Sequence, residues 1–478
     1  MSDQDADEGT PPEEPRDDDA ATGVGFKGAG SLASGVGLRG AGSQAVGVGF
    51  NSGAISGLAG VSAGIGAMLG ASGAYQSMQE SIAEMISPST KALNALAASN
   101  LSSLSSSISK LYAKDLMPSF DSINALIRHM TEAPALTRSS DYAVLDEPES
   151  AYSSHMESPQ SYFQATEEVI TCFDDLHAAI TKLISKTPDL PLVWRGVRNA
   201  EWGMHSHLYR HLMNTNRVVP PQRSPKKAQP YPDEDQMVAA EREILSIARR
   251  DWRFDNMSAL ETFARIQHAG GPTRLIDVTK NPYIGAWFAV EFDQDEERKD
   301  ARLFALATRP VAQDGKPPAP DSALELDDLG AARDPFWHLL TDNASRQKLD
   351  WGTGARRRIW VPPAYDPRIS AQNAAFVLDG VPMTSKKLAS YFTVERNVYW
   401  RRADLLASAS IYAKMLKPTR RPMYNSRNFA PTFSFRIEAA AKQEIREVME
   451  SRFGYRLSYI YPDMAALAEH LKRRPLNG

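Results

Sequence analysis

Between residues 163 and 474, apolar side chains recur at the spacings typical of helices and strands. Helical spacing predicts helices at residues 167–183, 235–252 and 257–268. Short apolar runs predict strands at residues 190–194, 273–278 and 302–308. The helices and strands do not alternate regularly. We therefore expect an α+β fold over residues 163–474, a compact mixed sheet with flanking helices.

Two helix ends in this region carry clear signals. Gly270 and Gly271 follow the third predicted helix, and glycine is the usual residue of a left-handed cap. Asn281 precedes Pro282, which is the order expected of an N-cap and the first helical position. A mostly apolar helix is expected to follow at residues 283–291.

The first 74 residues lack such a pattern. Residues 1–22 are acidic and proline-rich, with few apolar side chains, so we expect a disordered tail. Residues 23–74 form a low-complexity region in which a glycine-rich octapeptide at residues 23–30 recurs at residues 35–42 and, degraded, from residue 47. Its composition favours a flexible linker, although the single Phe or Leu of each repeat could also bind a partner.

Residues 75–131 again carry apolar positions at broadly helical spacing, broken at Pro88 and Pro118. A helical hairpin or a self-association segment is expected there. Residues 132–162 turn polar and are interpreted as a linker. The uncharged run between Gly40 and Gln79 has too few strongly apolar residues for a spanning helix, so we do not expect membrane binding.

Overall composition excludes some classes of protein and leaves others open. The net charge of −4 gives no bulk attraction to nucleic acid or membrane. A single cysteine, Cys172, excludes an internal disulfide and a Cys-rich zinc site, and it suits a reducing cytosol. The chain starts with acidic residues, unlike a signal peptide, so we expect a cytoplasmic protein.

Polar side chains concentrate in residues 267–282, where a strand joins a helix. Gln267, His268, Thr273, Arg274 and Asp277 fall within this short passage. A structural loop needs turn residues but not so many different hydrogen-bonding groups, so this passage is the strongest candidate for chemistry. His268 is either a helix cap or a functional group, and Asp277 is either a turn carboxylate or a catalyst.

A second candidate is Arg195, expected just past the end of an apolar strand. A guanidinium held there could bind phosphate or carboxylate through two parallel hydrogen bonds, or it could form an ordinary salt bridge. The helix expected after Asn281 would point its free N–H groups at this passage and favour an anion.

Two other sets of residues give weaker signals. His205, His207 and His211 lack a carboxylate or cysteine at ligand spacing, so no metal site is predicted. Basic residues cluster with aromatic ones at residues 356–360, 399–402 and 417–421. That pairing suits single-stranded nucleic acid, but solvated surface charge is the more common explanation.

These residues match a family signature. The chain resembles the FRG domain, named for a Phe-Arg-Gly motif, in Trp194-Arg195-Gly196, in residues 267–282, in residues 368–372 and in a closing helix near residues 461–467. Departures from the family pattern are Trp194, Ile276 and Ala374, which replace Phe, Leu and Gly. The resemblance covers residues 165–474 and implies a loose link to bacterial and phage conflict systems.

A fainter similarity is to ADP-ribosyltransferases. It implies an ADP-ribosyltransferase-like core and NAD as cofactor, with modification of a protein or nucleic acid or hydrolysis of NAD. The implied cofactor-binding residues are Arg195, Gln267, Thr273, Arg274, Thr279 and Asn281, and the implied catalytic residues are His268, Asp277 and Gln372. No metal is implied.

Gln372 stands where those enzymes carry a carboxylate, and an amide cannot act as a base or stabilise a developing positive charge. Either His268, Asp277 or another acid such as Glu395 substitutes for it, or the domain binds a nucleotide or RNA without transfer while the N-terminal arm recruits a partner. A third possibility is that the polar residues only hold a turn together.

Overall fold

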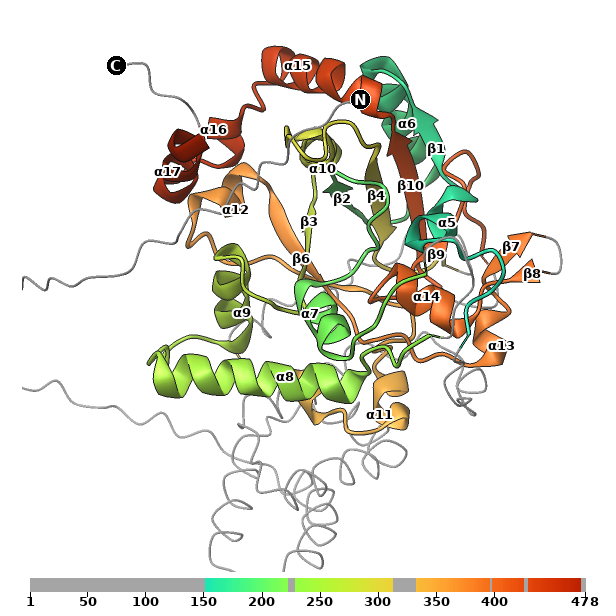
Figure 1. Cartoon of the computed structure of the whole chain (residues 1–478), viewed down its shortest axis with the longest axis vertical. Coiled ribbons are helices and arrows are strands. Elements are labelled where there is room, and N and C mark those ends of the chain that lie inside the picture. Colours follow the sequence, from blue (N-terminus) through green and yellow to red (C-terminus); the bar gives the residue numbers. More distant parts are fainter. Residues whose placement is uncertain (1–150, 222–227, 313–331, 396–397, 425–428, 474–478) are drawn as a thin grey trace, which may run out of the picture. The chain divides into compact units, whose positions relative to one another are not determined.

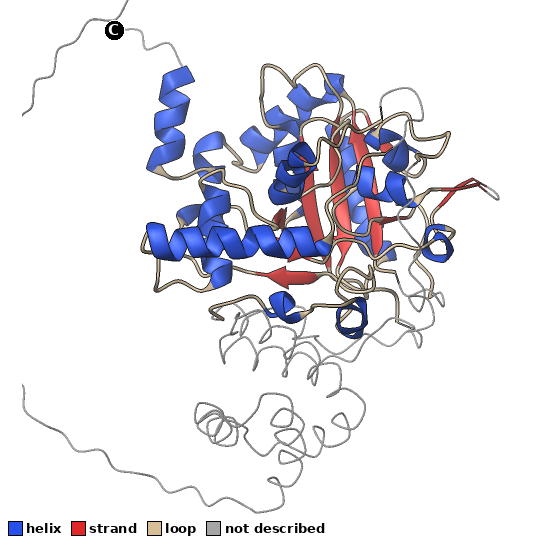
Figure 2. Cartoon of the chain, turned by 60° about the horizontal axis from the view of Figure 1, so that its bottom comes forward, coloured by secondary structure: helices blue, strands red, loops and turns tan. Residues whose placement is uncertain are grey.

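The computed structural model describes residues 151–221, 228–312, 332–395, 398–424 and 429–473. These residues form a sheet with helices on both faces (Figures 1 and 2). The expected segments 1–22, 23–74 and 75–131, and most of the expected linker 132–162, lie outside the described residues.

The sheet combines strands from distant parts of the chain. Among the described residues it has eight strands, in the order β1-β10-β4-β2-β3-β6-β5, with β9 also paired to β10. Their bounds are Glu168–Ile170 (β1), Leu192–Val197 (β2), Ile276–Thr279 (β3), Ala301–Ala307 (β4), Arg358–Trp360 (β5), Ala374–Leu378 (β6), Lys414–Met415 (β9) and Pro431–Ile437 (β10). The pairs β1–β10 and β9–β10 are parallel and the others antiparallel. A separate hairpin joins β7 (Thr393–Glu395) to β8 (Val398–Tyr399).

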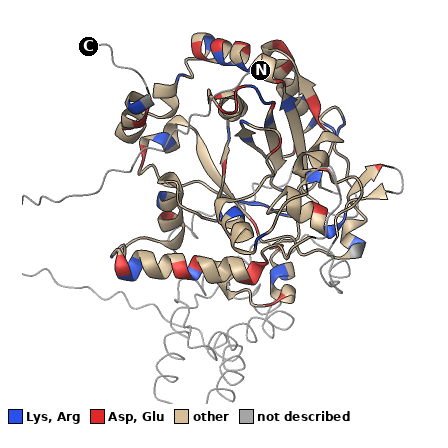
Figure 3. Cartoon of the chain, viewed as in Figure 1, with Lys and Arg blue, Asp and Glu red and all other residues tan. Residues whose placement is uncertain are grey.

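Helices of many lengths surround this sheet. They are α5 (Pro159–Gln164), α6 (Phe173–Lys186), α7 (His207–Thr215), α8 (Glu234–Ser246) with the π-helix η2 (Ile247–Asp251), α9 (Ala259–His268), α10 (Pro282–Val290), α11 (Asn343–Lys348), α12 (Pro367–Ala371), α13 (Lys386–Ala389), α14 (Arg402–Ser408), α15 (Lys442–Arg452), α16 (Leu457–Ile460) and α17 (Met464–Arg473). Short 3-10 turns are η4 (Phe336–Leu339) and η5 (Ala439–Ala441). Figure 3 shows charges of both signs along α8, and two of its acids, Glu234 and Glu241, are buried.

Alternation along the central strands gives the sheet two apolar faces. On β2, Val193 packs into a core with Phe304 and Leu306, whereas Trp194 packs on the opposite face with Ala305. Both faces are buried because helices cover each of them. The predicted mixed sheet with flanking helices is therefore confirmed in its broad form, while an ADP-ribosyltransferase-like core remains a prediction.

Most predicted elements are present, with shifted ends. Both cap predictions are confirmed: Gly270 adopts φ +84°, and the Asn281 side chain accepts hydrogen bonds from the N–H groups of Tyr283 and Ile284. The helix predicted from residue 167 begins only at Phe173, because residues 168–170 pair with β10 as a strand. Likewise Arg195 lies inside β2, not past its end, since this strand continues to residue 197 along β4.

The folded region also starts earlier than predicted. Tyr152 and Met156 are buried in the main core, although both fall in the expected linker.

The basic triplet at residues 356–358 is buried as well. The Arg357 guanidinium donates hydrogen bonds to several carbonyl groups and to the Thr432 hydroxyl. This triplet is an interior structure and cannot serve as a nucleic-acid surface.

Close packing of β2 against α10 depends on glycine. A Cβ atom added to Gly196 would lie 2.0 Å from the carbonyl O of Gly285 and 2.5 Å from the N of Ala289. Since no Cβ fits there, the third residue of the Trp-Arg-Gly motif allows the helix to lie directly on the strand that carries Arg195.

No helix within the described part of the chain is both long and apolar enough to cross a membrane.

Candidate functional site

A large cavity opens beside the middle of the sheet. Its volume is about 1640 Å³, and its lining comes from β2, α7, α9, β3 and α12. Six of the nine predicted site residues line this cavity, and they are Arg195, Gln267, His268, Asp277, Thr279 and Gln372. Thr273, Arg274 and Asn281 are not among its lining residues.

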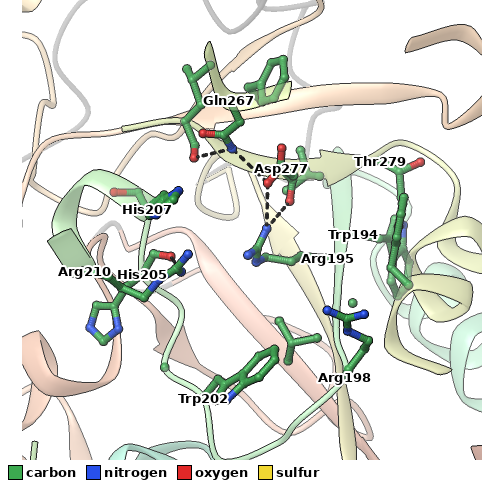
Figure 4. Close-up of a pocket in the computed structure, with 18 of the residues that line it drawn as sticks. Trp194, Arg195, Arg198, Trp202, His205, His207, Arg210, Gln267, Asp277 and Thr279 are labelled. Atoms are coloured by element: carbon green, nitrogen blue, oxygen red, sulfur yellow. Dashed lines mark hydrogen bonds and ion pairs between the residues drawn. The ribbon is translucent and has the colours of Figure 1, made fainter. Parts of the chain in front are cut away.

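Arg195 and Asp277 form the centre of this lining (Figure 4). The Arg195 Nη1 donates a hydrogen bond of 2.8 Å to the carbonyl O of Asp277 and lies 3.7 Å from its carboxylate Oδ2. The Arg195 side chain is 18% exposed and that of Asp277 is 64% exposed. Burial lowers the pKa of Arg195, and the nearby carboxylate partly offsets this. The pair thus presents an accessible carboxylate held by a largely buried cation.

Gln267 holds the same carboxylate from another side. Its Nε2 donates 2.9 Å to Asp277 Oδ2 and 3.1 Å to the carbonyl O of Leu275. The fully buried Thr273 in turn donates from its hydroxyl to Gln267 Oε1, which orients the amide. Thr273 therefore acts through Gln267, not by contact with a ligand in the cavity.

A second guanidinium reaches this part of the cavity from α7. Arg210 Nη1 donates 2.7 Å to the carbonyl O of His205. Burial lowers the pKa of Arg210, the charge of Arg195 lowers it further, and Asp277 opposes the shift. Arg195 and Arg210 thus both line the cavity that holds the Asp277 carboxylate, and either guanidinium could donate hydrogen bonds to an anionic ligand.

Gln372 and Thr279 lie at the β3 and α12 side of the cavity. The Thr279 hydroxyl donates 2.8 Å to the carbonyl O of Gln372 and accepts a hydrogen bond of 3.0 Å from the backbone N–H of Asn281. The Gln372 Nε2 donates 3.0 Å to the carbonyl O of Ile460. Thr279 thus fixes the turn at Gln372, and the Gln372 amide ties that turn to α16.

Arg274 belongs to a different cluster inside the molecule. Its side chain is 3% exposed and forms ion pairs with Glu241 at 2.7 Å and Glu234 at 2.9 Å. Glu241 also accepts hydrogen bonds from Trp337 and His338. All three guanidinium nitrogens of Arg274 have described acceptors, so this residue is a structural support and its predicted contact with a cofactor has no geometric basis.

The helix terminus at Asn281 also faces elsewhere. Asn281 Nδ2 donates 3.0 Å to the hydroxyl of Tyr455, while its Oδ1 caps α10. The expectation that this terminus points into the site is therefore not met.

His268 does line the cavity, and its Nδ1 lies 3.4 Å from Asp366 Oδ2. Glu395, an alternative acid, belongs to the β7–β8 hairpin and is not a lining residue.

The three histidines on and before α7 do not form a metal site. His205 is buried, stacks on Tyr209 and has an Nε2 2.9 Å from the carbonyl O of Leu406. Burial lowers the pKa of His205 to about 4, so the ring is neutral at physiological pH. In the described ranges no group of His, Cys, Asp or Glu is arranged to hold a metal ion.

Several lining residues were not predicted from the sequence. They include Arg198, Trp202, Arg210, Arg368 and Tyr461. Arg198 lies 3.0 Å from Asp293, and the Arg368 guanidinium pairs with Asp463 and lies over the Tyr461 ring. Arg198 follows the Trp-Arg-Gly motif, and Arg368 and Tyr461 lie in other segments that resemble the FRG domain, but none of the three was selected as a site residue. Trp202 and Arg210 belong to no such motif and share the cavity with these segments only after folding.

Comparison with known protein families gives one match, which covers part of the cavity lining. Residues 191–298 match the family model of the FRG domain, which places the Trp-Arg-Gly strand and the Gln267–Pro282 block in one family unit. No curated protein and no solved structure matches the chain.

Proposed function

We propose that the FRG domain of this chain binds NAD in the cavity beside Arg195 and Asp277 and cleaves the bond between nicotinamide and ribose. The ADP-ribose then passes to a macromolecule or to water. The observation that carries this proposal is the Asp277 carboxylate, which is 64% exposed to the cavity and held in place by Arg195 and Gln267. A fixed carboxylate in a cavity is what this chemistry requires.

The reaction places positive charge at one carbon of the substrate. When the bond between the ribose C1′ and the nicotinamide nitrogen breaks, its electron pair leaves with nicotinamide and C1′ becomes oxocarbenium-like. A nearby carboxylate stabilises that charge. An acceptor oxygen then bonds to C1′, and its proton passes to the Asp277 carboxylate and from there to solvent.

The cations beside Asp277 suit the rest of NAD. A guanidinium presents donors in a fork that matches two phosphate oxygens. Arg195 is held by β2, and Arg210 lines the same cavity from α7. Diphosphate bound between them would leave the ribose of the nicotinamide half near Asp277.

Asp277 is the best of the candidate acids for geometric reasons. Gln372 is an amide whose Nε2 is engaged by the carbonyl of Ile460. His268 lies beside Asp366, and Glu395 is outside the cavity lining. Among these candidates only Asp277 is an accessible carboxylate that both pairs with one lining residue, Arg195, and accepts a hydrogen bond from another, Gln267.

A second candidate function is a module that binds a nucleotide without cleaving it. The amide at Gln372 favours this alternative, because it stands where the resembling transferases carry a carboxylate. Both functions need the same anion site at Arg195. They differ only in whether nicotinamide is released.

The test is to incubate the purified full chain with NAD and follow nicotinamide release for the natural protein and for Asp277→Asn. We expect release that falls by about 100-fold or more in the variant, as for the loss of one electrostatic group in other enzymes. The matched control is Asp255→Asn, because Asp255 is also a partly exposed aspartate paired with an arginine, at 3.3 Å, but lies outside the cavity lining. If no nicotinamide is released in any condition while NAD still binds, the proposed enzyme activity is wrong and the non-catalytic binding module is correct.

A further inference from the structure

The size of the cavity leaves room for a second ligand. Pockets for one small molecule usually measure about 300–1000 Å³. This cavity measures about 1640 Å³ and continues from Asp277 to the wall formed by α7. The wall formed by α7 can therefore take a second ligand beside NAD, and Arg210 would contact phosphates of both ligands.

One face of α7 supplies that wall. His207, Arg210, His211 and Asn214 all line the cavity, and their spacing of three and four residues places them on one side of the helix. Each of these side chains can donate hydrogen bonds, and none is acidic. The opposite side of α7 is fixed in the interior by the buried residues Leu208, Tyr209 and Met213. The polar face is consequently held towards the cavity by the core.

An exposed aromatic ring lines the same cavity as this face. Trp202 lines the cavity and is 43% exposed. Figure 4 shows it across the open space from Asp277, on the same side as Arg198. A large exposed ring next to donor groups costs solvation in the free protein, and base stacking is one way to cover it.

We propose that the α7 face (His207, Arg210, His211 and Asn214) and Trp202 bind a single-stranded nucleic acid, which is the acceptor of the ADP-ribose. This step rests on the proposed function for its covalent part. A base would stack on Trp202, and backbone phosphates would accept hydrogen bonds from the α7 face. A hydroxyl oxygen of the strand then bonds to C1′ as the electron pair of the broken bond leaves with nicotinamide, and the hydroxyl proton goes to Asp277.

Two acids near this wall sharpen the proposal. Glu157 and Glu201 also line the cavity, and Glu201 precedes Trp202 in the chain. A carboxylate next to bound phosphates opposes binding by like-charge repulsion. Removal of the Glu201 charge should therefore strengthen the binding of a nucleic acid, whereas it would weaken the binding of a basic protein.

The test is fluorescence anisotropy with the full chain and labelled oligo-uridine or oligo-thymidine of about 12 nucleotides, within the usual range of such sites. We expect saturable binding that weakens about tenfold in Trp202→Ala, as expected for loss of one stacked base. Glu201→Gln should bind more tightly. Arg210→Gln should reduce the slope of log affinity against log salt by about 0.7, the value for one phosphate contact on a single strand.

The matched control is Trp252→Ala, since Trp252 is 65% exposed but lies outside the cavity lining. No oligonucleotide binding, equal loss in the two tryptophan variants, or tighter binding of a basic peptide than of the oligonucleotides would overturn the proposal. Oligonucleotide binding is measured without NAD, so its result does not depend on whether the protein releases nicotinamide. If release occurs, radiolabel from NAD should move to the oligonucleotide and not to the chain or an added peptide.

Discussion

Two arginines in this domain pair with carboxylates and have opposite surroundings. Arg274 is 3% exposed and its partner Glu241 is 0% exposed, so the pair lies wholly inside the protein. Arg195 is 18% exposed and its partner Asp277 is 64% exposed, so the carboxylate faces the cavity. Both arginines lie within the residues that match the FRG family model, yet only the carboxylate of the Arg195 pair is exposed to the cavity.

The difference separates a structural cluster from a candidate site. A buried charge that loses its partner is strongly destabilising, because nothing else compensates it. An exposed pair contributes little to stability, since water screens the charges. The Arg274 cluster should therefore control folding, and the Arg195–Asp277 pair should control ligand binding and chemistry.

The largest effect is expected from breaking the interior cluster. Arg274→Met leaves Glu234 and Glu241 buried without their cation, which should lower the free energy of unfolding by about 3–5 kcal/mol. Urea denaturation measures this as a lower midpoint. Arg265→Met is the control, because Arg265 pairs with Glu261 on an exposed helix face and its loss should change stability by less than about 1 kcal/mol. Equal midpoints for the two variants would contradict the comparison.

Acid should weaken the same cluster. Burial alone would raise the pKa of Glu241, but Arg274 and the His338 hydrogen bond lower it to about 2, from an ordinary value of 4.5. Because the folded pKa is the lower one, the ionised carboxylate stabilises the fold above pH 4.5 and this stabilisation is lost as pH falls towards about 2. The midpoint difference between the natural chain and Glu241→Gln should shrink through that window. A constant difference would show that Glu241 does not titrate as described.

A smaller effect is expected at Gln372. Gln372→Glu replaces the amide that donates to the carbonyl O of Ile460 with a carboxylate that cannot donate, which should cost about 1 kcal/mol in unfolding free energy. Nicotinamide release should not rise. A large gain of release in this variant would move the catalytic acid from Asp277 to position 372.

The smallest stability effect is expected at the cavity pair. Asp277→Asn keeps an acceptor for Arg195 and Gln267, so the unfolding free energy should change by less than about 0.5 kcal/mol. Circular dichroism during urea titration measures it. A loss comparable with that of Arg274→Met would mean that Asp277 is structural.

Much of the fold could be predicted from local pattern. The caps at Gly270 and Asn281 depend on residue types with specific backbone and hydrogen-bonding preferences, and both are present. Strand ends were less predictable, because β1 and the extension of β2 depend on pairing with β10 and β4. Pairing partners that lie more than 100 residues away leave no local signal.

The site was only partly predictable for the same reason. A high density of polar residues located the Gln267–Pro282 block but could not tell which side chains face inward. Arg274 and Asp277 are three residues apart, yet one is buried beside α8 and the other faces the cavity. Arg210 on α7 and Trp202, which precedes this helix, were missed because they follow no motif and reach the cavity only through tertiary packing.

The cavity is expected to bind NAD through Arg195. The most direct measurement is a calorimetric titration of NAD into the Asp277→Asn chain, which keeps Arg195 but should not turn the ligand over. We predict saturable binding that weakens by about tenfold or more when Arg195→Ala is added, as expected for loss of a charge-assisted hydrogen bond. No heat of binding, or equal affinity with and without Arg195, would contradict the account.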